Sequence, residues 1–318
     1  MESSASSSSE NQSQNRRSGL EPLLQKTSRT FALTIPLLPD PLRTEVAVAY
    51  LLFRIIDTFE DATRWNGGRR ADALGQFVRL IDGGDLQDAQ GLTAQWLSDP
   101  PLEHPGYLEL LAATPRVLEW SRGLRPGARE QLRLHLGRSA RGMAEVVARA
   151  GDHDMLQLQT LQDLRDYCYT VAGIVGEMLT ELFLLQSPAL MNAAAGLRER
   201  AVAFGEGLQL VNILKDARPD ASEGRVYLPQ QATLAEVFML ARADLRSAAE
   251  YTDLLRSAGG ERGLVAFNAL NSRLAIGTLR LLRDKGLGAK LTRLQVTTIA
   301  AQVMHAVETG GVLFPESP

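Results

Sequence analysis

Residues 42–61 read LRTEVAVAYLLFRIIDTFED, and this stretch predicts a long helix with one face in the protein core. Asp40 and Pro41 stand just before it, as an N-cap residue and a first helical residue would. No glycine or proline interrupts the stretch. Its core-facing side chains recur at helical spacings of four and three, at Val46, Tyr50 and Phe53.

The same spacing then places carboxylates on the extension of the buried face, at Asp57, Glu60 and Asp61. Carboxylates that face a core lose hydration, and those three or four residues apart repel each other. One explanation is a frayed helix end that returns to the surface. The other is a site for a hard cation, because Mg²⁺ binds carboxylate oxygens together with substrate phosphates.

Composition limits the class of protein. The chain has 318 residues, is 45% hydrophobic and 22% charged, and can bury a large core in one domain or two. Its net charge of −3 gives no basic excess, so we expect no nucleic-acid partner. The single cysteine, Cys168, excludes an intramolecular disulfide and fits a reducing compartment. The four histidines lack metal-ligand spacing.

The two ends differ in composition from the middle. Residues 1–19 are rich in serine and are expected to be a disordered tail, residues 20–308 a single domain, and residues 309–318 a loose tail. No run approaches the roughly 20 apolar residues that span a bilayer. We therefore expect a cytoplasmic protein, with peripheral membrane contact left open.

Helical patterns dominate the rest of the chain, and no alternating strand pattern of useful length occurs, so the fold class is predicted to be all-α. Loops are expected at residues 65–70 and 223–229. The further helices are expected at about 71–81, 106–124, 126–151, 166–186, 201–217, 234–257, 263–285 and 291–308.

A second polar stripe lies on the predicted helix at 201–217, which is apolar nearly all round. Gln209, Asn212 and Asp216 share one of its faces at spacings of three and four. Asp220 follows after Pro219, which we expect to place Asp220 in the turn beyond the helix. A polar stripe on a buried helix suggests a binding site.

Two glycines, Gly173 and Gly176, share a helix face with Tyr169 and Thr180. Each glycine inside a helix costs about 1 kcal/mol relative to alanine. The cost implies that something approaches the backbone closely there. Tight helix packing and a ligand wall both remain open as explanations.

Two acidic helices that face each other across a bundle would form metal-binding walls around a central apolar cavity. Such a cavity suits a substrate with a diphosphate head and a hydrocarbon tail. Mg²⁺ would turn the diphosphate into a leaving group, and aromatic faces would stabilise the carbocation left behind.

From about residue 23 to 305 the chain resembles the squalene/phytoene synthase family of head-to-head prenyl transferases. The matching elements, in chain order, are Ser28-Arg29-Thr30-Phe31, Asp57-Thr58-Phe59-Glu60-Asp61 with Arg54 ahead of it, Tyr167 to Gly176, the set Gln209, Asn212, Asp216 and Asp220, and Gly224 to Pro229. Three positions depart from the family pattern. Thr170 replaces a tyrosine, Pro219 a glutamate, and Lys215 an arginine whose bidentate fork a lysine cannot supply.

The resemblance implies a single-domain isoprenoid-synthase bundle that joins two farnesyl diphosphates through presqualene diphosphate to squalene. Asp-Thr-Phe-Glu-Asp is closer to the squalene synthase form of the first motif than to the phytoene synthase form. Mg²⁺ and NADPH are implied as cofactors, and NADPH rests on the family alone because no dinucleotide fingerprint is present.

The resemblance also implies the site residues. The catalytic set is Tyr167, Asp57, Asp61, Asp216 and Asp220, with Tyr167 for proton removal or cation stabilisation. The substrate-binding set is Ser28, Arg29, Phe31, Arg54, Val171, Gly173, Gln209, Asn212, Lys215 and Arg225. The metal-binding set is Asp57, Glu60, Asp61, Asn212, Asp216 and Asp220.

Two alternatives to a squalene synthase remain. The enzyme could lack the reductive step and make presqualene diphosphate, dehydrosqualene or phytoene. A non-catalytic relative would serve as an assembly or binding factor, and the populated acidic motifs argue against it. The sequence does not decide between C15 and C20 substrates, nor does it give the oligomeric state.

Overall fold

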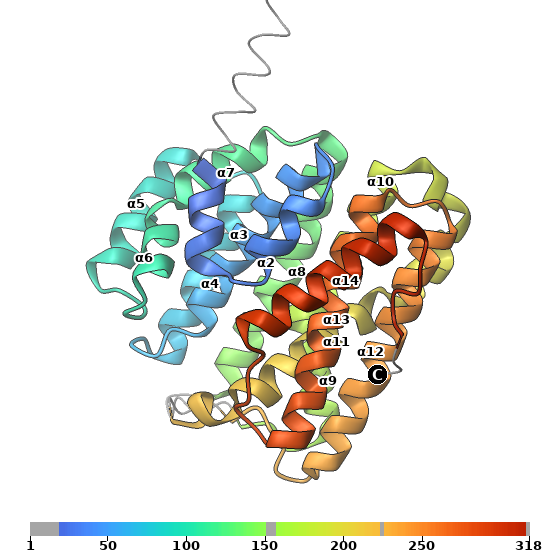
Figure 1. The fold of residues 1–318 in the computed structure, drawn as a ribbon. Coiled ribbons are helices and arrows are strands. Elements are labelled where there is room, and N and C mark those ends of the chain that lie inside the picture. The colour runs from blue at the N-terminus through green and yellow to red at the C-terminus, as the bar shows by residue number, and fades with distance from the viewer. Residues whose placement is uncertain (1–18, 151–156, 223–225, 316–318) are drawn as a thin grey trace, which may run out of the picture.

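The computed structural model describes residues 19–150, 157–222 and 226–315. Within these ranges the chain is helical with no strand, apart from one isolated bridge between Gln157 and Val226, so the all-α prediction is confirmed (Figure 1). The predicted N-terminal tail falls almost wholly outside the described residues.

The first described residues, 19–27, are helical. In chain order the elements that follow are α2 (Phe31–Thr34), η1 (Ile35–Leu37), α3 (Leu42–Glu60), α4 (Gly67–Ile81), α5 (Leu86–Ser98), α6 (Pro105–Ala112), α7 (Thr114–Arg122), α8 (Pro126–Ala150), α9 (Leu161–Cys168), η3 (Tyr169–Gly173), α10 (Ile174–Gln186), η4 (Pro188–Ala193), α11 (Ala194–Ser222), α12 (Leu234–Ser257), α13 (Arg262–Lys285) and α14 (Arg293–Thr309).

Helix α3 forms where its sequence predicts, but its start differs in detail. Pro41 occupies the N-cap position, while the Asp40 carboxylate accepts a hydrogen bond from the Thr44 hydroxyl at 3.3 Å. The loop expected at 65–70 is wrong for residues 67–70. The Asn66 side chain accepts a hydrogen bond from the Arg69 backbone N–H and so starts α4 at Gly67.

Two further helix boundaries that involve a proline differ from those expected. The helix expected at 106–124 is two helices, because Pro115 lies in the first turn of α7 and marks a new start. Helix α11, in contrast, continues past Pro219 to Ser222. The expected helix end at Pro219 is therefore wrong for the backbone, and tertiary context overrides the local signal.

Helices α9, η3 and α10 form one continuous stretch, with a π-helical turn at η3. In the described part of the chain, this stretch (Leu161–Gln186) is the one helix long and apolar enough to cross a membrane. Because 56% of its apolar window is buried inside the molecule, it has the character of a core helix.

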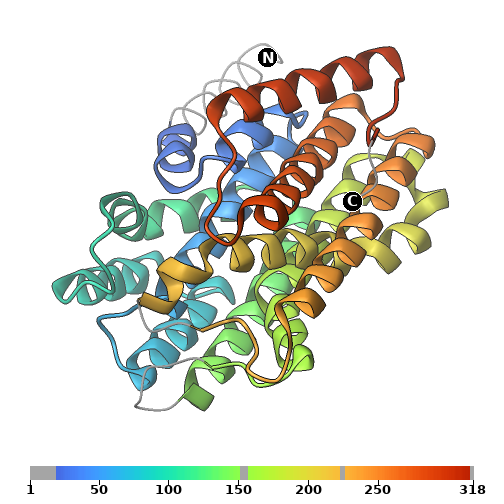
Figure 2. The ribbon, with the colours of Figure 1, turned by 60° about the horizontal axis from the view of Figure 1, so that its bottom comes forward.

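The helices build one body around a shared apolar interior. Helix α4 packs along α8, α11 packs along α12, and α10 contacts both α8 and α11. Figure 2 shows α14 crossing the outside of α13. Val171 and Leu208 contact both large apolar clusters, one mainly around α3 and α8 and the other around α11–α13. The two clusters therefore meet at η3 and α11.

Two glycine contacts set the distance between the middle helices. A Cβ atom added at Gly176 would lie 2.0 Å from the Ala201 carbonyl oxygen, and one added at Gly205 would lie 2.0 Å from the Ala172 carbonyl oxygen. The backbones of the α9–α10 stretch and α11 are therefore in direct contact. For Gly173 and Gly176 the sequence left two explanations open, tight helix packing and a ligand wall. Tight packing accounts for Gly176.

The segment after α14 is held in place at residues 311–313, where we expected a loose tail. Leu313 is buried, and the Arg273 and Arg256 guanidinium groups donate hydrogen bonds to the carbonyl oxygens of Leu313 and Gly311 at 2.8 and 2.6 Å.

We predict that Gly176→Ala lowers the free energy of unfolding by at least about 2 kcal/mol, because the new methyl group forces two helices apart. Gly91→Ala is the matched control. Gly91 lies on α5, and an added Cβ atom there would have nothing within 4 Å. This substitution should raise the free energy of unfolding by roughly 0.5–1 kcal/mol. Urea unfolding followed by circular dichroism measures both. Equal effects of the two substitutions would contradict the packing account.

Candidate active site

The last turn of α3 places three carboxylates against the protein interior. Glu60 is only 6% exposed, and Asp57 and Asp61 are half-buried. The neighbouring Phe59 is fully buried, so this is no frayed end. No basic residue lies in the last turn, and the helix C-terminus itself carries negative partial charge. The charge at this position needs compensation from elsewhere.

Arg54 is the nearest cation on the same helix. Its guanidinium lies 3.4 Å from the Asp57 carboxylate and over the rings of Tyr50 and Tyr107, at 5.8 and 5.4 Å from their centroids. The Arg54 Nε atom is buried and has no hydrogen-bond partner in the structure. An oxygen of an anionic ligand would satisfy this donor.

The charge of Asp57 is only partly compensated. Its pKa is raised to about 6, because the effect of burial, together with the nearby Asp61 charge, exceeds the opposing effect of the Arg54 charge. An added divalent cation would favour the ionised carboxylates, so the donor set on α3 fits Mg²⁺. Within the described ranges, no three Asp, Glu, His or Cys side chains converge closely enough to hold a metal by themselves.

Arg70 was missed by sequence reasoning, because we assigned it to a loop. It is buried on α4, and its Nη1 atom donates a hydrogen bond to the Glu60 carbonyl oxygen at 3.0 Å. It therefore places positive charge at the C-terminus of α3. The signal in the sequence was the Arg69-Arg70 pair shortly after the acidic motif.

The N-terminal element supports the same face of α3. The Ser28 hydroxyl accepts a hydrogen bond from the backbone N–H of Phe31, the first residue of α2, at 2.9 Å. The Phe31 ring lies 5.2 Å from that of Tyr50, whose hydroxyl donates to the Thr27 carbonyl oxygen. Ser28 and Phe31 thus brace the Tyr50–Arg54 face, whereas Arg29 lies exposed.

Tyr167 of α9 is brought to the α3 carboxylates. It is buried and stacks on Tyr227 with ring centroids 4.9 Å apart. Burial raises the pKa of Tyr167 well above its usual value, and the charges of Glu60 and Asp61 raise it further. Its phenol is therefore a protonated hydrogen-bond donor at neutral pH. Tyr227 is a ring partner that sequence reasoning did not identify.

The second acidic helix is arranged differently from the first. The Lys215 ammonium donates to the Asn212 side-chain oxygen at 2.8 Å and lies 3.2 Å from the Asp216 carboxylate. Lys290, beyond α13, approaches Asp216 at 3.3 Å. Gln209 on the same helix is half-buried, whereas Asn212 is exposed. Two lysines thus neutralise Asp216.

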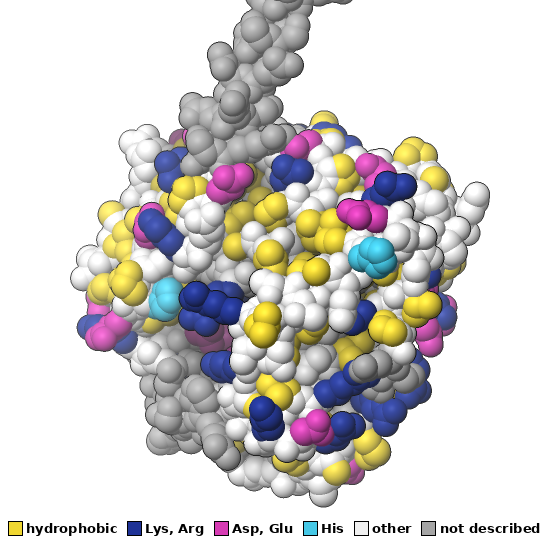
Figure 3. All heavy atoms as spheres, in the orientation of Figure 1, with side chains coloured by type: hydrophobic (Ala, Val, Ile, Leu, Met, Phe, Trp, Pro, Cys, Tyr) yellow, Lys and Arg dark blue, Asp and Glu magenta, His cyan; other side chains and the backbone are white. Residues whose placement is uncertain are grey.

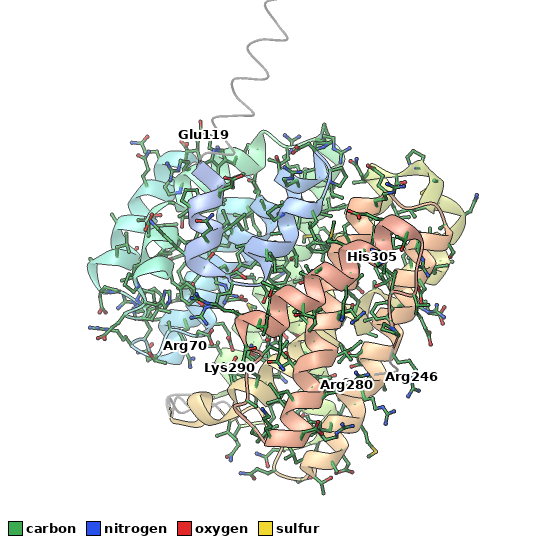
Figure 4. The ribbon with its side chains drawn as sticks, in the orientation of Figure 1. Arg70, Glu119, Arg246, Arg280, Lys290 and His305 are labelled. Carbon is green, nitrogen blue, oxygen red and sulfur yellow. The ribbon has the colours of Figure 1, made fainter. Side chains whose placement is uncertain are left out.

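Lys290 was not among the predicted site residues, because its pairing with Asp216 depends on how α13 packs against α11. Figure 4 shows where Lys290 and Arg70 lie. The Asp220 side chain and all of Arg225, two further predicted site residues, fall outside what the structure describes.

The π-helical turn η3 carries Val171 and Gly173. Val171 packs against both large apolar clusters. A Cβ atom added at Gly173 would lie 2.9 Å from the Tyr169 ring, 3.1 Å from Val202 and 3.5 Å from Glu206. Gly173 therefore allows η3 to pack closely on α11, and Val171 lies where the two clusters meet.

The helical bundle has the all-α isoprenoid-synthase fold, with carboxylates of α3 turned inward beside Arg54 and Tyr167. Residues 24–258 match the family model described as squalene/phytoene synthase. This chain belongs to that family.

Two curated relatives carry the name squalene synthase. The protein from Schizosaccharomyces pombe is 30% identical over 212 residues, which cover 66% of this chain and 43% of the relative. The protein from Candida albicans is 28% identical over 209 residues, covering 66% of this chain and 44% of the relative. The match thus spans less than half the length of either relative.

Solved structures show the same fold. TcSQS in complex with a ligand superposes with a TM-score of 0.75 at 23% identity, covering 92% of this chain and 86% of that one. A dehydrosqualene synthase in complex with a ligand superposes with a TM-score of 0.60 at 19% identity, covering 94% and 99% of the two chains.

We predict that Asp57→Asn gains stability relative to the wild-type protein as the pH rises from acid to neutral. The folded state holds the Asp57 proton with a pKa of about 6, against 3.8 for the ordinary carboxyl. Stability from this group is therefore present at about pH 4 and lost as the pH rises through 6. From pH 4 to 7.5, the unfolding free energy of the variant should rise by roughly 2 kcal/mol relative to wild type.

Urea unfolding of both proteins at the two pH values measures this difference. Asp72→Asn, on the exposed face of α4, is the control and should show no such change. A pH-independent difference between Asp57→Asn and wild type would contradict the assignment.

Proposed function

We propose that this protein is a prenyltransferase of the squalene synthase type. It would condense two farnesyl diphosphates head-to-head through presqualene diphosphate to squalene, with release of diphosphate. The observation that carries the proposal is the inward-facing carboxylate group at the end of α3, in which Asp57 keeps a raised pKa beside Arg54 and which faces Tyr167 in a chain of this family.

The α3 carboxylates are the residues that would hold Mg²⁺, and Asn212, Asp216 and Asp220 would do so on the second helix. Bound Mg²⁺ would supply charge neutralisation of the diphosphate as it leaves. Lys215 and Lys290, which now lie on Asp216, would pair with phosphate oxygens when a substrate arrives. Arg54 would donate its buried Nε–H to the same head group.

The aromatic side chains would serve the cationic part of the reaction. Tyr167 and Tyr227 form a stacked pair at the end of the apolar cluster around α11–α13. Their ring faces attract positive charge, and their burial excludes the water that would quench a carbocation. Because the pKa of Tyr167 is raised, its role would be cation stabilisation and hydrogen-bond donation at neutral pH, with proton removal left to an ionised group.

An enzyme that lacks the reductive step is the second candidate. It would stop at presqualene diphosphate or make dehydrosqualene or phytoene. In its favour, the aligned region covers 43% of the squalene synthase from Schizosaccharomyces pombe, so more than half of that enzyme lies outside the match. NADPH, which squalene formation needs, is supported by family membership alone.

Product analysis separates the candidates. Purified protein is incubated with farnesyl diphosphate and Mg²⁺, with and without NADPH, and the lipid extract is examined by gas chromatography with mass spectrometry. We expect squalene only when NADPH is present. Presqualene diphosphate or dehydrosqualene that persists with NADPH would support the second candidate. No diphosphate release, with geranylgeranyl diphosphate also tried, would overturn the enzyme proposal.

We predict that Asp57→Ala and Asp216→Ala each lower turnover roughly a thousandfold, because each removes a group that would hold the metal and head group. Diphosphate release gives the rate, and circular dichroism checks that the helical fold is kept. Asp72→Ala, exposed on α4, is the control and should retain full rate. Full activity in either site variant would remove that residue from the proposed site.

A further inference from the structure

An open groove lies on the surface between the first half of α12 and the last half of α13. Its volume is about 680 Å³. Apolar side chains of both helices line it together with Arg242, Arg280 and Arg283. The set is apolar apart from three arginines and contains no carboxylate, although the whole chain has a net charge of −3.

The apolar side chains at the groove are unusually exposed. Met239 is 63% exposed and Leu234 is 43% exposed. The two lie on α12 beside the half-buried Phe238. Exposed apolar side chains that gather at an open groove are typical of a surface that contacts a partner protein, a ligand or a membrane.

Basic side chains frame these apolar residues. Arg246 follows Arg242 by one helical turn on α12. Arg283 on α13 has a 68% exposed side chain and forms a surface ion pair with the neighbouring Asp284 at 2.9 Å, a kind of contact that an anionic lipid phosphate can replace. Figure 3 shows Lys and Arg side chains, with acidic ones among them, mixed with hydrophobic ones over α12 and α13, and Figure 4 shows Arg246 and Arg280 on this face. The combination suits a partner that is anionic outside and apolar beneath.

The groove also adjoins the interior around Tyr167. Leu279 and Leu282 line the groove and belong to the same apolar cluster as Tyr167 and Tyr227. Leu287 packs against that cluster and precedes Lys290, the partner of Asp216, by three residues. The surface is therefore continuous, through apolar contacts, with the candidate site.

We propose that the α12–α13 groove docks this protein on an anionic lipid bilayer. Leu234 and Met239 enter the headgroup region, and the arginines pair with lipid phosphates. A second copy of the chain fits less well, because a two-fold contact would set the arginines of one groove against those of the other. The inference concerns the surface alone and stands whether or not the proposed reaction does.

Sedimentation with vesicles tests the proposal on the full chain without any prenyl substrate. We expect binding to vesicles of phosphatidylcholine with phosphatidylglycerol, and little binding to phosphatidylcholine alone. Arg246→Gln with Arg283→Gln should weaken binding roughly twenty-five-fold, at about fivefold for each arginine. Met239→Ser should weaken it about threefold through lost apolar burial.

Matched controls lie on other faces of the molecule. Arg116→Gln with Arg129→Gln removes two exposed arginines, and Met191→Ser removes a methionine that is 55% exposed. Both should bind vesicles like wild type. Equal loss in the control and groove variants, no binding to anionic vesicles, or self-association of the free chain that the groove variants abolish would each overturn the proposal.

Discussion

The last turn of α3 concentrates carboxylates where a helix already carries negative partial charge and where burial has removed water. The protein meets this charge with Arg54 on the same helix and Arg70 from α4. The compensation is incomplete, since the pKa of Asp57 is still raised to about 6. Buried carboxyl groups with a raised pKa cluster at functional sites, where a ligand can supply the missing positive charge. The end of α3 therefore links the fold to the proposed chemistry.

The rest of the bundle holds groups against that turn. Glycine contacts bring the α9–α10 stretch, which includes the π-helical turn η3, directly onto α11. Tyr167, at the end of α9, thereby faces Glu60 and Asp61 from a different part of the chain. The second acidic helix, α11, holds Asp216 between two lysines, so the two helices are electrostatically unlike. On α3 the pKa of Asp57 stays raised despite Arg54, whereas on α11 two ammonium groups lie within 3.3 Å of Asp216.

Helical periodicity was enough to predict the fold class and most long helices, including α3 and α12–α14. Helix α5 was missed because its buried residues, Ala89, Thr93 and Trp96, form a weak apolar pattern around Gly91. On the site, the inward direction of the α3 carboxylates followed from spacing. Arg70 was missed because its segment was assigned to a loop instead of the first turn of α4. Lys290 could not be predicted, because its contact with Asp216 joins segments that are distant in sequence.

The central claim is that the α3 carboxylates are held ready for a divalent cation that binds with a diphosphate. Electron paramagnetic resonance titration with Mn²⁺, in the presence of inorganic diphosphate, measures this directly in wild type and in Asp57→Asn. The account predicts that wild type binds Mn²⁺ and that the variant binds at least about tenfold more weakly. Equal Mn²⁺ affinity in the two proteins would contradict it.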